Sequence, residues 1–192
     1  MSQNNNNPRR DFFKSLIKKS GETVSDVIQY KMEKNFPRVV LRPPGAIEEY
    51  QFLLNCSRCG DCATECPKEA IHLMTNASGA YKNTPFIDPK HQACVFCEDF
   101  PCIEACEPKS LVKSTNKNSM KIGIATTNLS DCLVYQNQHC DYCFGSCPPG
   151  VNAIQKSKEG WPEIDKDLCV GCGKCAYICV SQTGDAISIE PI

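Results

Sequence analysis

Residues 56–67 read CSRCGDCATECP, which places four cysteines at intervals of two, two and three residues ahead of a proline. Residues 169–180 repeat these intervals, with Val180 in place of the proline. Two further groups are variants: one widens a single interval to four residues, and the other widens its first interval to seven. The 16 cysteines of the chain fall into four groups with none left over, namely Cys56, Cys59, Cys62 and Cys66; Cys94, Cys97, Cys102 and Cys106; Cys132, Cys140, Cys143 and Cys147; and Cys169, Cys172, Cys175 and Cys179.

This spacing is typical of the thiolate ligands of 4Fe-4S clusters. Three cysteines at i, i+3 and i+6 of a tight loop surround one iron-sulfur cube, and in two-cluster ferredoxins the fourth cysteine binds the neighbouring cluster. Gly60, Gly171 and Gly173 suit a loop that follows a cofactor closely, because glycine adds no side chain. The sequence therefore predicts four 4Fe-4S clusters held by all 16 cysteines.

Two other uses of cysteine fit this pattern less well. Eight disulfides would satisfy the even count, but disulfides do not produce repeated intervals, and no cleavable secretory signal is evident. Structural zinc sites usually hold two pairs of ligands separated by a dozen or more residues. Here three or four thiols crowd into one short loop, which favours iron-sulfur clusters over both alternatives.

Short apolar segments flank the cysteine groups and predict the strands of small ferredoxin modules. Between these segments there is room for only one or two helical turns. The expected fold class is therefore α+β and loop-rich. The predicted strands are residues 70–73, 85–88, 162–165 and 186–189, with weaker ones at 121–124 and 151–154.

The outer two groups share the unaltered spacing and the inner two share altered spacing, so we expect an inner two-cluster module inserted into an outer one. The outer module would comprise residues 41–85 with 160–192, and the inner module residues 86–159. Pairing of consecutive groups is the alternative. If the fourth cysteines cross within nested modules, the ligand sets are Cys56, Cys59, Cys62 and Cys179; Cys169, Cys172, Cys175 and Cys66; Cys94, Cys97, Cys102 and Cys147; and Cys132, Cys140, Cys143 and Cys106.

Residues 1–40 form a segment of different composition. Arg9-Arg10 looks like the start of a twin-arginine export signal, but Lys18-Lys19 interrupts the apolar stretch that such a signal needs. Apolar residues at helical spacing indicate instead an amphipathic N-terminal helix, which packs on the rest of this chain or on a partner subunit. We therefore expect a cytoplasmic location, with periplasmic export through the twin-arginine-like motif as the alternative.

Charge and hydropathy narrow the class of partner. The formal net charge is -1 and the sequence pI is about 6.3, with no long block of Lys and Arg, which excludes a typical nucleic-acid surface. No stretch approaches the roughly 20 apolar residues of a spanning helix. Four bound clusters would bring the net charge to about -9, which favours partner proteins with basic docking surfaces.

The segment leading into the first group carries a family resemblance. Arg42-Pro43-Pro44-Gly45-Ala46, followed by Phe52-Leu53 and the first cysteines, resembles the ferredoxin-type NapG/MauM and NapF proteins, which accompany periplasmic nitrate reductase and methylamine oxidation. The resemblance extends over residues 8–192. It implies a four-cluster electron carrier whose ligands are the cysteines assigned above.

We therefore expect an electron-transfer protein that relays single electrons to or from a partner oxidoreductase, and not an enzyme in its own right. One alternative is a maturation or assembly accessory protein, which labile clusters would indicate. Another is a protein that uses its clusters only as structural staples, for which no reversible redox change would be found.

Overall fold

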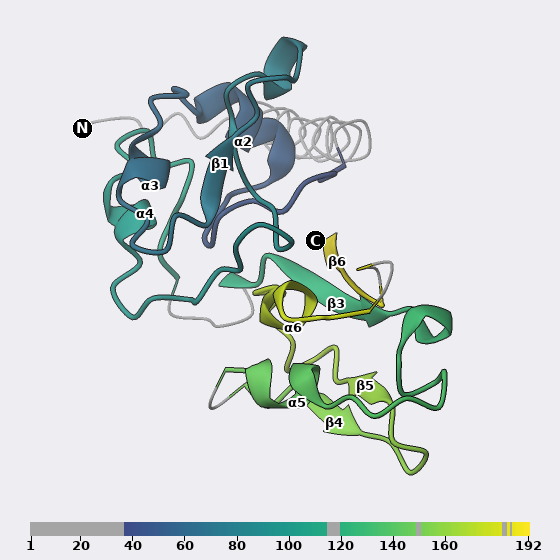
Figure 1. The fold of residues 1–192 in the computed structure, drawn as a ribbon. Helices are drawn as coiled ribbons and strands as arrows, with labels where there is room; N and C mark the ends of the chain where they lie inside the picture. Colours follow the sequence, from purple (N-terminus) through teal and green to yellow (C-terminus); the bar gives the residue numbers. More distant parts are fainter. Residues whose placement is uncertain (1–36, 115–119, 149–150, 182–183, 185) are drawn as a thin grey trace, which may run out of the picture. The chain divides into compact units, whose positions relative to one another are not determined.

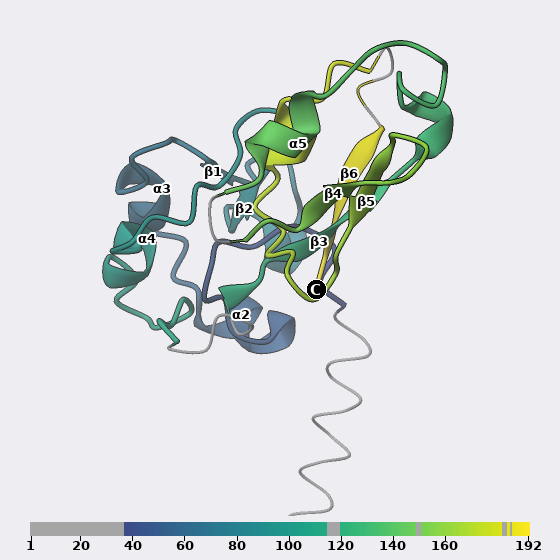
Figure 2. The same cartoon turned by 90° about the horizontal axis from the view of Figure 1, so that it is seen from below.

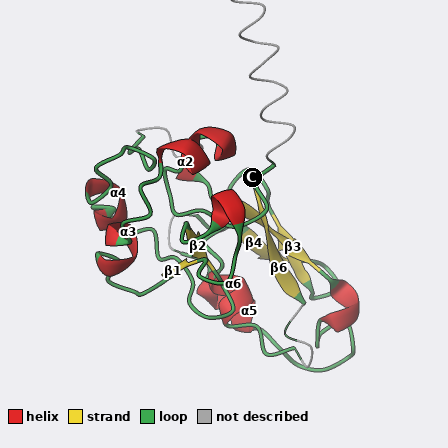
Figure 3. Ribbon diagram, turned by 90° about the horizontal axis from the view of Figure 1, so that it is seen from above, coloured by secondary structure: helices red, strands yellow, loops and turns green. Residues whose placement is uncertain are grey.

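The computed structural model describes residues 37–114, 120–148, 151–181, 184 and 186–192 (Figure 1). The predicted N-terminal helix lies outside these residues. Short helices separated by long loops make this a small, loop-rich α+β structure, as expected (Figure 3). The helices are α2 (Glu49–Asn55), α3 (Asp61–Thr64), α4 (Pro101–Glu104), α5 (Tyr142–Ser146) and α6 (Lys174–Tyr177), with 3₁₀ helices η1 (Gly79–Tyr81) and η3 (Leu129–Asp131).

Three antiparallel strand pairs organise the described chain. β1 (Ile71–Leu73) pairs with β2 (Pro85–Ile87), and β4 (Ile154–Lys156) pairs in the same way with β5 (Pro162–Ile164). β3 (Gly123–Thr127) pairs with β6 (Ile187–Pro191), and Figure 2 shows this pair beside β4 and β5. Each of the two hairpins, β1–β2 and β4–β5, therefore joins the end of one cysteine group to the start of the next.

The first half of the described chain, residues 38–114, repeats the connectivity of the second half, residues 120–192. Ala46 bridges Leu111, and hydrogen bonds flank this bridge: Ile47 N–H donates to the Ser110 carbonyl at 3.1 Å and Val112 N–H to the Gly45 carbonyl at 2.7 Å. These residues take the places that β3 and β6 hold in the second half. One pattern thus occurs twice in succession within a single compact unit, residues 38–192.

This pairing differs from the expected nested division of residues 41–85 with 160–192 around residues 86–159. β3 precedes the third cysteine group and pairs with β6, which follows the fourth. The first and second groups are joined in turn by the β1–β2 hairpin. Consecutive strands meet because a short connection brings them together at a lower entropic cost than a long one.

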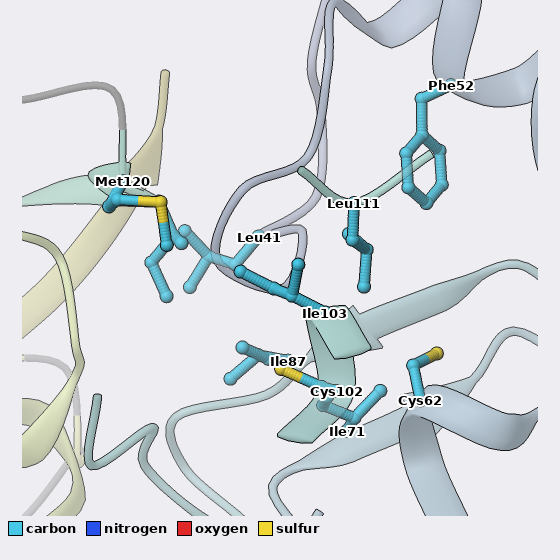
Figure 4. Packing of buried hydrophobic residues seen from close by; sticks show 10 residues of the cluster. Leu41, Phe52, Cys62, Ile71, Ile87, Cys102, Ile103, Leu111 and Met120 are labelled. Carbon is cyan, nitrogen blue, oxygen red and sulfur yellow. The ribbon is translucent and has the colours of Figure 1, made fainter. Parts of the chain in front are cut away.

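Cysteines contribute directly to both hydrophobic cores. In the first core, Cys102 lies beside Ile71 and Ile87 (Figure 4). This core also includes Met120 and Ile122 from the second half. The second core has few large aliphatic side chains, its buried members being Ala125, Ala153, Cys169, Cys175, Ala176 and Ile187. Cores with so few large apolar side chains need additional cross-links, which metal ligation by the thiols would supply.

A buried ion pair fixes the segment that leads into the first cysteine. The Arg42 side chain is fully buried, and its Nη2 lies 2.6 Å from Oε1 of Glu49, which opens α2. Arg42 Nη1 also donates to the carbonyl of Pro85 at 2.7 Å and to Oγ1 of Thr84 at 2.9 Å. Cys56 is the C-cap of α2, so the ion pair and the bond to Pro85 hold the first cysteine near the start of β2.

Candidate metal centres

The sixteen thiols surround four cavities, and each cavity is lined by four of them. We number the cavities by the group that supplies three cysteines. Site 1 contains Cys56, Cys59, Cys62 and Cys106; site 2 contains Cys94, Cys97, Cys102 and Cys66; site 3 contains Cys132, Cys140, Cys143 and Cys179; and site 4 contains Cys169, Cys172, Cys175 and Cys147. Their empty volumes, including open solvent at the mouths, run only from about 310 to about 360 Å³. Because the four cavities have similar volumes and each is lined by four cysteines, we expect them to bind the same kind of group.

The grouping of the cysteines differs from the nested sets. Each site takes its fourth cysteine from the neighbouring group in the chain, so Cys66 lies at site 2 and Cys106 at site 1. In the second half, Cys147 lies at site 4 and Cys179 at site 3. The nested sets had placed Cys66 with the fourth group, Cys179 with the first, Cys147 with the second and Cys106 with the third. The hairpins explain the difference, because Cys66 precedes β1 and its partner strand β2 leads into the second group.

Left-handed backbone shapes three of the four cysteine loops at equivalent positions. One such residue precedes the second cysteine, and another lies two residues before the third. Glycine reaches this conformation without steric cost, whereas other residues adopt it rarely. The glycine pattern therefore indicated both turns in the fourth group and one of the two in the first, but missed both in the second. The residues are Arg58 and Gly60 for site 1, Phe96 and Phe100 for site 2, and Gly171 and Gly173 for site 4.

Backbone amides point at cysteine sulfurs around the sites. Ala70 N–H donates to Sγ of Cys66 at 3.3 Å, and Ala153 N–H donates to Sγ of Cys147 at 3.2 Å. Similar bonds run from Leu111 to Cys106, from Phe96 to Cys94 and from Ala125 to Cys169. Amide donors favour the negative charge of a thiolate, and they are one of the means by which proteins tune iron-sulfur clusters.

Burial makes these thiols poor acids on their own. Burial, together with the smaller effect of neighbouring thiols, raises the pKa of Cys62, Cys94 and Cys175 to about 12. Burial likewise raises the pKa of Cys102 and Cys143 to about 11. At neutral pH these groups would be protonated, so a set of four thiolates requires a cationic partner such as iron.

The geometry fits a cluster better than a single metal ion. Among the residues that the structure describes, no three His, Cys, Asp or Glu side chains converge closely enough to hold one ion. The cysteines instead stand around the walls of cavities. All sixteen are free thiols, which also disfavours a disulfide framework. Four sulfur donors spread about a cavity match the ligand set of a 4Fe-4S cube.

Contacts between the sites run in the order 1, 2, 4, 3. Cys102 of site 2 acts electrostatically on Cys62 of site 1, and Cys143 of site 3 acts on Cys175 of site 4. The two halves meet where Cys94 N–H of site 2 donates to the Cys172 carbonyl of site 4 at 3.0 Å. Sites 2 and 4 are therefore linked through the backbones of their own cysteines.

One residue at site 1 was missed by the sequence analysis. Ser110 lines this cavity, is only 1% exposed, and its hydroxyl has no hydrogen-bond partner among the described residues. A buried hydroxyl without a partner is unusual and calls for an explanation. An occupant of the cavity with hydrogen-bond acceptors would supply one, which again fits a sulfide-containing cluster.

Four thiol-lined cavities in a small, loop-rich α+β fold define an iron-sulfur protein of the ferredoxin type. A family model described as a 4Fe-4S binding domain matches residues 162–184. The chain is 32% identical to the ferredoxin-type protein NapG of Escherichia coli (strain K12), over 97% of this chain and 87% of that protein. It is also 32% identical to the methylamine utilization ferredoxin-type protein MauM of Methylobacillus flagellatus, over 95% of this chain and 83% of that protein. The chain therefore belongs to the ferredoxin-type NapG/MauM family, a class of electron carriers and not of enzymes.

The ferredoxin-type protein NapF of Escherichia coli (strain K12) is 30% identical over 72% of this chain and 79% of that protein. No solved structure matches the chain. Within the described ranges, no helix is both long enough and apolar enough to cross a membrane.

Proposed function

We propose that this protein carries electrons through four 4Fe-4S clusters, one at each of sites 1 to 4. The observation that carries the proposal is the distribution of the sixteen thiols over four like-sized cavities, four to each. When bound, such clusters supply one-electron redox chemistry at potentials that the surrounding protein sets. The ligand sets are those of the cavities, with the fourth cysteines exchanged between consecutive groups.

The chain's own residues have three tasks in this function. The thiols hold the metal, and amides such as those of Ala70 and Ala153 donate to the ligand sulfurs. Burial of Cys62 and Cys175 keeps water from much of the ligand set. The link between Cys94 and Cys172 keeps sites 2 and 4 adjacent, so that the four sites form a series suited to transfer from one end to the other.

The proposal is tested by metal analysis of anaerobically purified protein. Four cubane clusters predict about 16 iron and about 16 acid-labile sulfide per chain, with negligible zinc. Reduction with dithionite should bleach the visible absorbance, and reoxidation should restore it. A fully loaded preparation with half this iron would show that two of the cavities hold something else, and irreversible bleaching would contradict electron transfer.

The partner that we propose is an oxidoreductase, reached through its catalytic subunit or another electron-carrying subunit. Two observations support this: the relatives include proteins named for methylamine utilization, and the loaded chain would carry a net charge of about -9. An anionic carrier favours a basic docking surface, and association should slow as salt screens the attraction. Anaerobic affinity purification from the native cell, with elution by salt, identifies the partner; retention that salt does not weaken would argue against charge-driven docking.

A further inference from the structure

Site 1 differs from the other three sites by one buried hydroxyl. Ser110 is 1% exposed, and its Oγ is one of two buried side-chain polar atoms without a partner in the part of the chain that the structure describes. The other is Nε2 of His72. Ser110 lines the cavity of site 1 together with the four cysteines of that site.

The backbone around Ser110 is held on both sides. The Ser110 carbonyl accepts from Ile47 N–H at 3.1 Å, and the next residue, Leu111, donates its N–H to Sγ of Cys106 at 3.3 Å. Leu111 is itself buried and pairs with Ala46. The serine is therefore fixed at the wall of the cavity, and its hydroxyl oxygen is buried.

The other sites have alanine at the corresponding position. In each case a small buried residue lies four to seven residues after the fourth cysteine of its group and directly before a buried or half-buried Ile or Leu. This small residue lines the same cavity as that fourth cysteine. These residues are Ala70 at site 2, Ala153 at site 4 and Ala186 at site 3. The repeat thus provides three natural counterparts without a hydroxyl.

We propose that the Ser110 hydroxyl donates a hydrogen bond to an inorganic sulfide of the cluster in site 1 and raises the reduction potential of that cluster. This inference rests on the proposed function. Among the described residues nothing accepts from the hydroxyl, and Ser110 lines the cavity, so we assign the acceptor to the occupant of site 1. A donor aimed at sulfur stabilises the reduced, more negative state more than the oxidised state.

The consequence for the series of sites is an asymmetry. Site 1 stands at one end of the order 1, 2, 4, 3, and it alone has a hydroxyl at this position of the repeat. The hydroxyl therefore favours residence of an electron at site 1 relative to the same site with an alanine. Ser110 thus influences where the electron resides, although it does not bind iron.

The test is Ser110→Ala, studied by anaerobic redox titration with electron paramagnetic resonance. Loss of one neutral hydrogen bond should shift the redox equilibrium of one cluster by about fivefold, which is a fall of about 40 mV at 59 mV per tenfold change for a single electron. Iron content should stay at the wild-type value, because no ligand is changed. The site 1 signal is identified as the one that Cys59→Ser alters.

A reciprocal variant and an independent measurement complete the test. Ala70→Ser should raise the potential of site 2, and Ser110→Thr should retain the site 1 value because it keeps the hydroxyl. Electron-nuclear double resonance in deuterated buffer should detect an exchangeable proton at site 1 that Ser110→Ala removes. The proposal fails if Ser110→Ala retains its iron but moves no potential, or moves that of another site. Wild-type iron near zero would instead overturn the proposed function itself.

Discussion

Removal of the negative charge of Glu49 should destabilise the first half more than any other single change to its polar core. Arg42 is 0% exposed and Glu49 3% exposed, so Glu49→Gln would leave a guanidinium buried without a counter-charge. Breaking a buried pair by removing one partner costs about 3–5 kcal/mol. For a protein of this size each kcal/mol lowers the melting temperature by about 2–4 °C, so we expect a fall of about 10 °C.

The assay is thermal unfolding under anaerobic conditions, followed by near-ultraviolet circular dichroism and by the visible absorbance of the clusters. Arg38→Gln is the matched control, since Arg38 lies 3.5 Å from Glu49 but is 13% exposed. Burial lowers the pKa of Arg38, and the charge of Glu49 opposes this shift. This pair is longer and partly solvated, but Arg38 also donates to the Ile47 carbonyl at 2.6 Å, so Arg38→Gln should cost about 1–2 kcal/mol.

A double variant distinguishes the stability lost through the unpaired charge from the stability lost through altered packing. Arg42→Met combined with Glu49→Leu removes both charges together, and such replacements often restore the stability lost when one partner is removed. We expect it to recover at least half of the fall seen with Glu49→Gln. The reasoning would be refuted if Glu49→Gln melted no lower than Arg38→Gln, or if the double variant melted lower than Glu49→Gln.

Three further outcomes are expected. Cys106→Ser should alter the resonance signal of site 1 and Cys179→Ser that of site 3, measured against Cys59→Ser; the nested sets require Cys179→Ser to alter site 1. Gly173→Ala, at φ +80° with a Cβ that would lie 2.6 Å from Pro89, should cost about 2 kcal/mol in thermal unfolding; an unchanged melting temperature would show that Pro89 yields. Residues 1–45 fused to an export-dependent reporter should give no periplasmic activity, whereas twin-arginine-dependent transport would reverse the proposed cytoplasmic location.

The strands were predictable because their signal is local. The expected segments 85–88 and 162–165 correspond to β2 (Pro85–Ile87) and β5 (Pro162–Ile164), and segment 70–73 overlaps β1. Alternation of apolar residues between turn signals reports on one strand and its own solvent exposure. The α+β, loop-rich character followed from these short elements and is confirmed.

The membership of the cysteine groups was equally accessible, but the exchange of the fourth cysteines was not. Spacing within a loop is a property of that loop and does not tell which other loop lies beside it. Strand pairing decides this, and residues 74–84 form a connection short enough to bring β1 against β2. In this structure the cysteines group by chain connectivity and not by similarity of spacing.

The widened intervals of the second and third cysteine groups have a structural explanation, which also shows why they do not report which groups pair. In the second group the additional residues include Glu98 and Asp99, which are exposed, and Pro101 then starts α4 so that Cys102 returns to the cavity. In the third group, residues 135–139 are all exposed, whereas Cys132 is buried. In both groups the additional length is directed to solvent while the thiols keep their places around a cavity. Wide intervals therefore record surface loops that each group can acquire independently, and two groups that share them need not share a module.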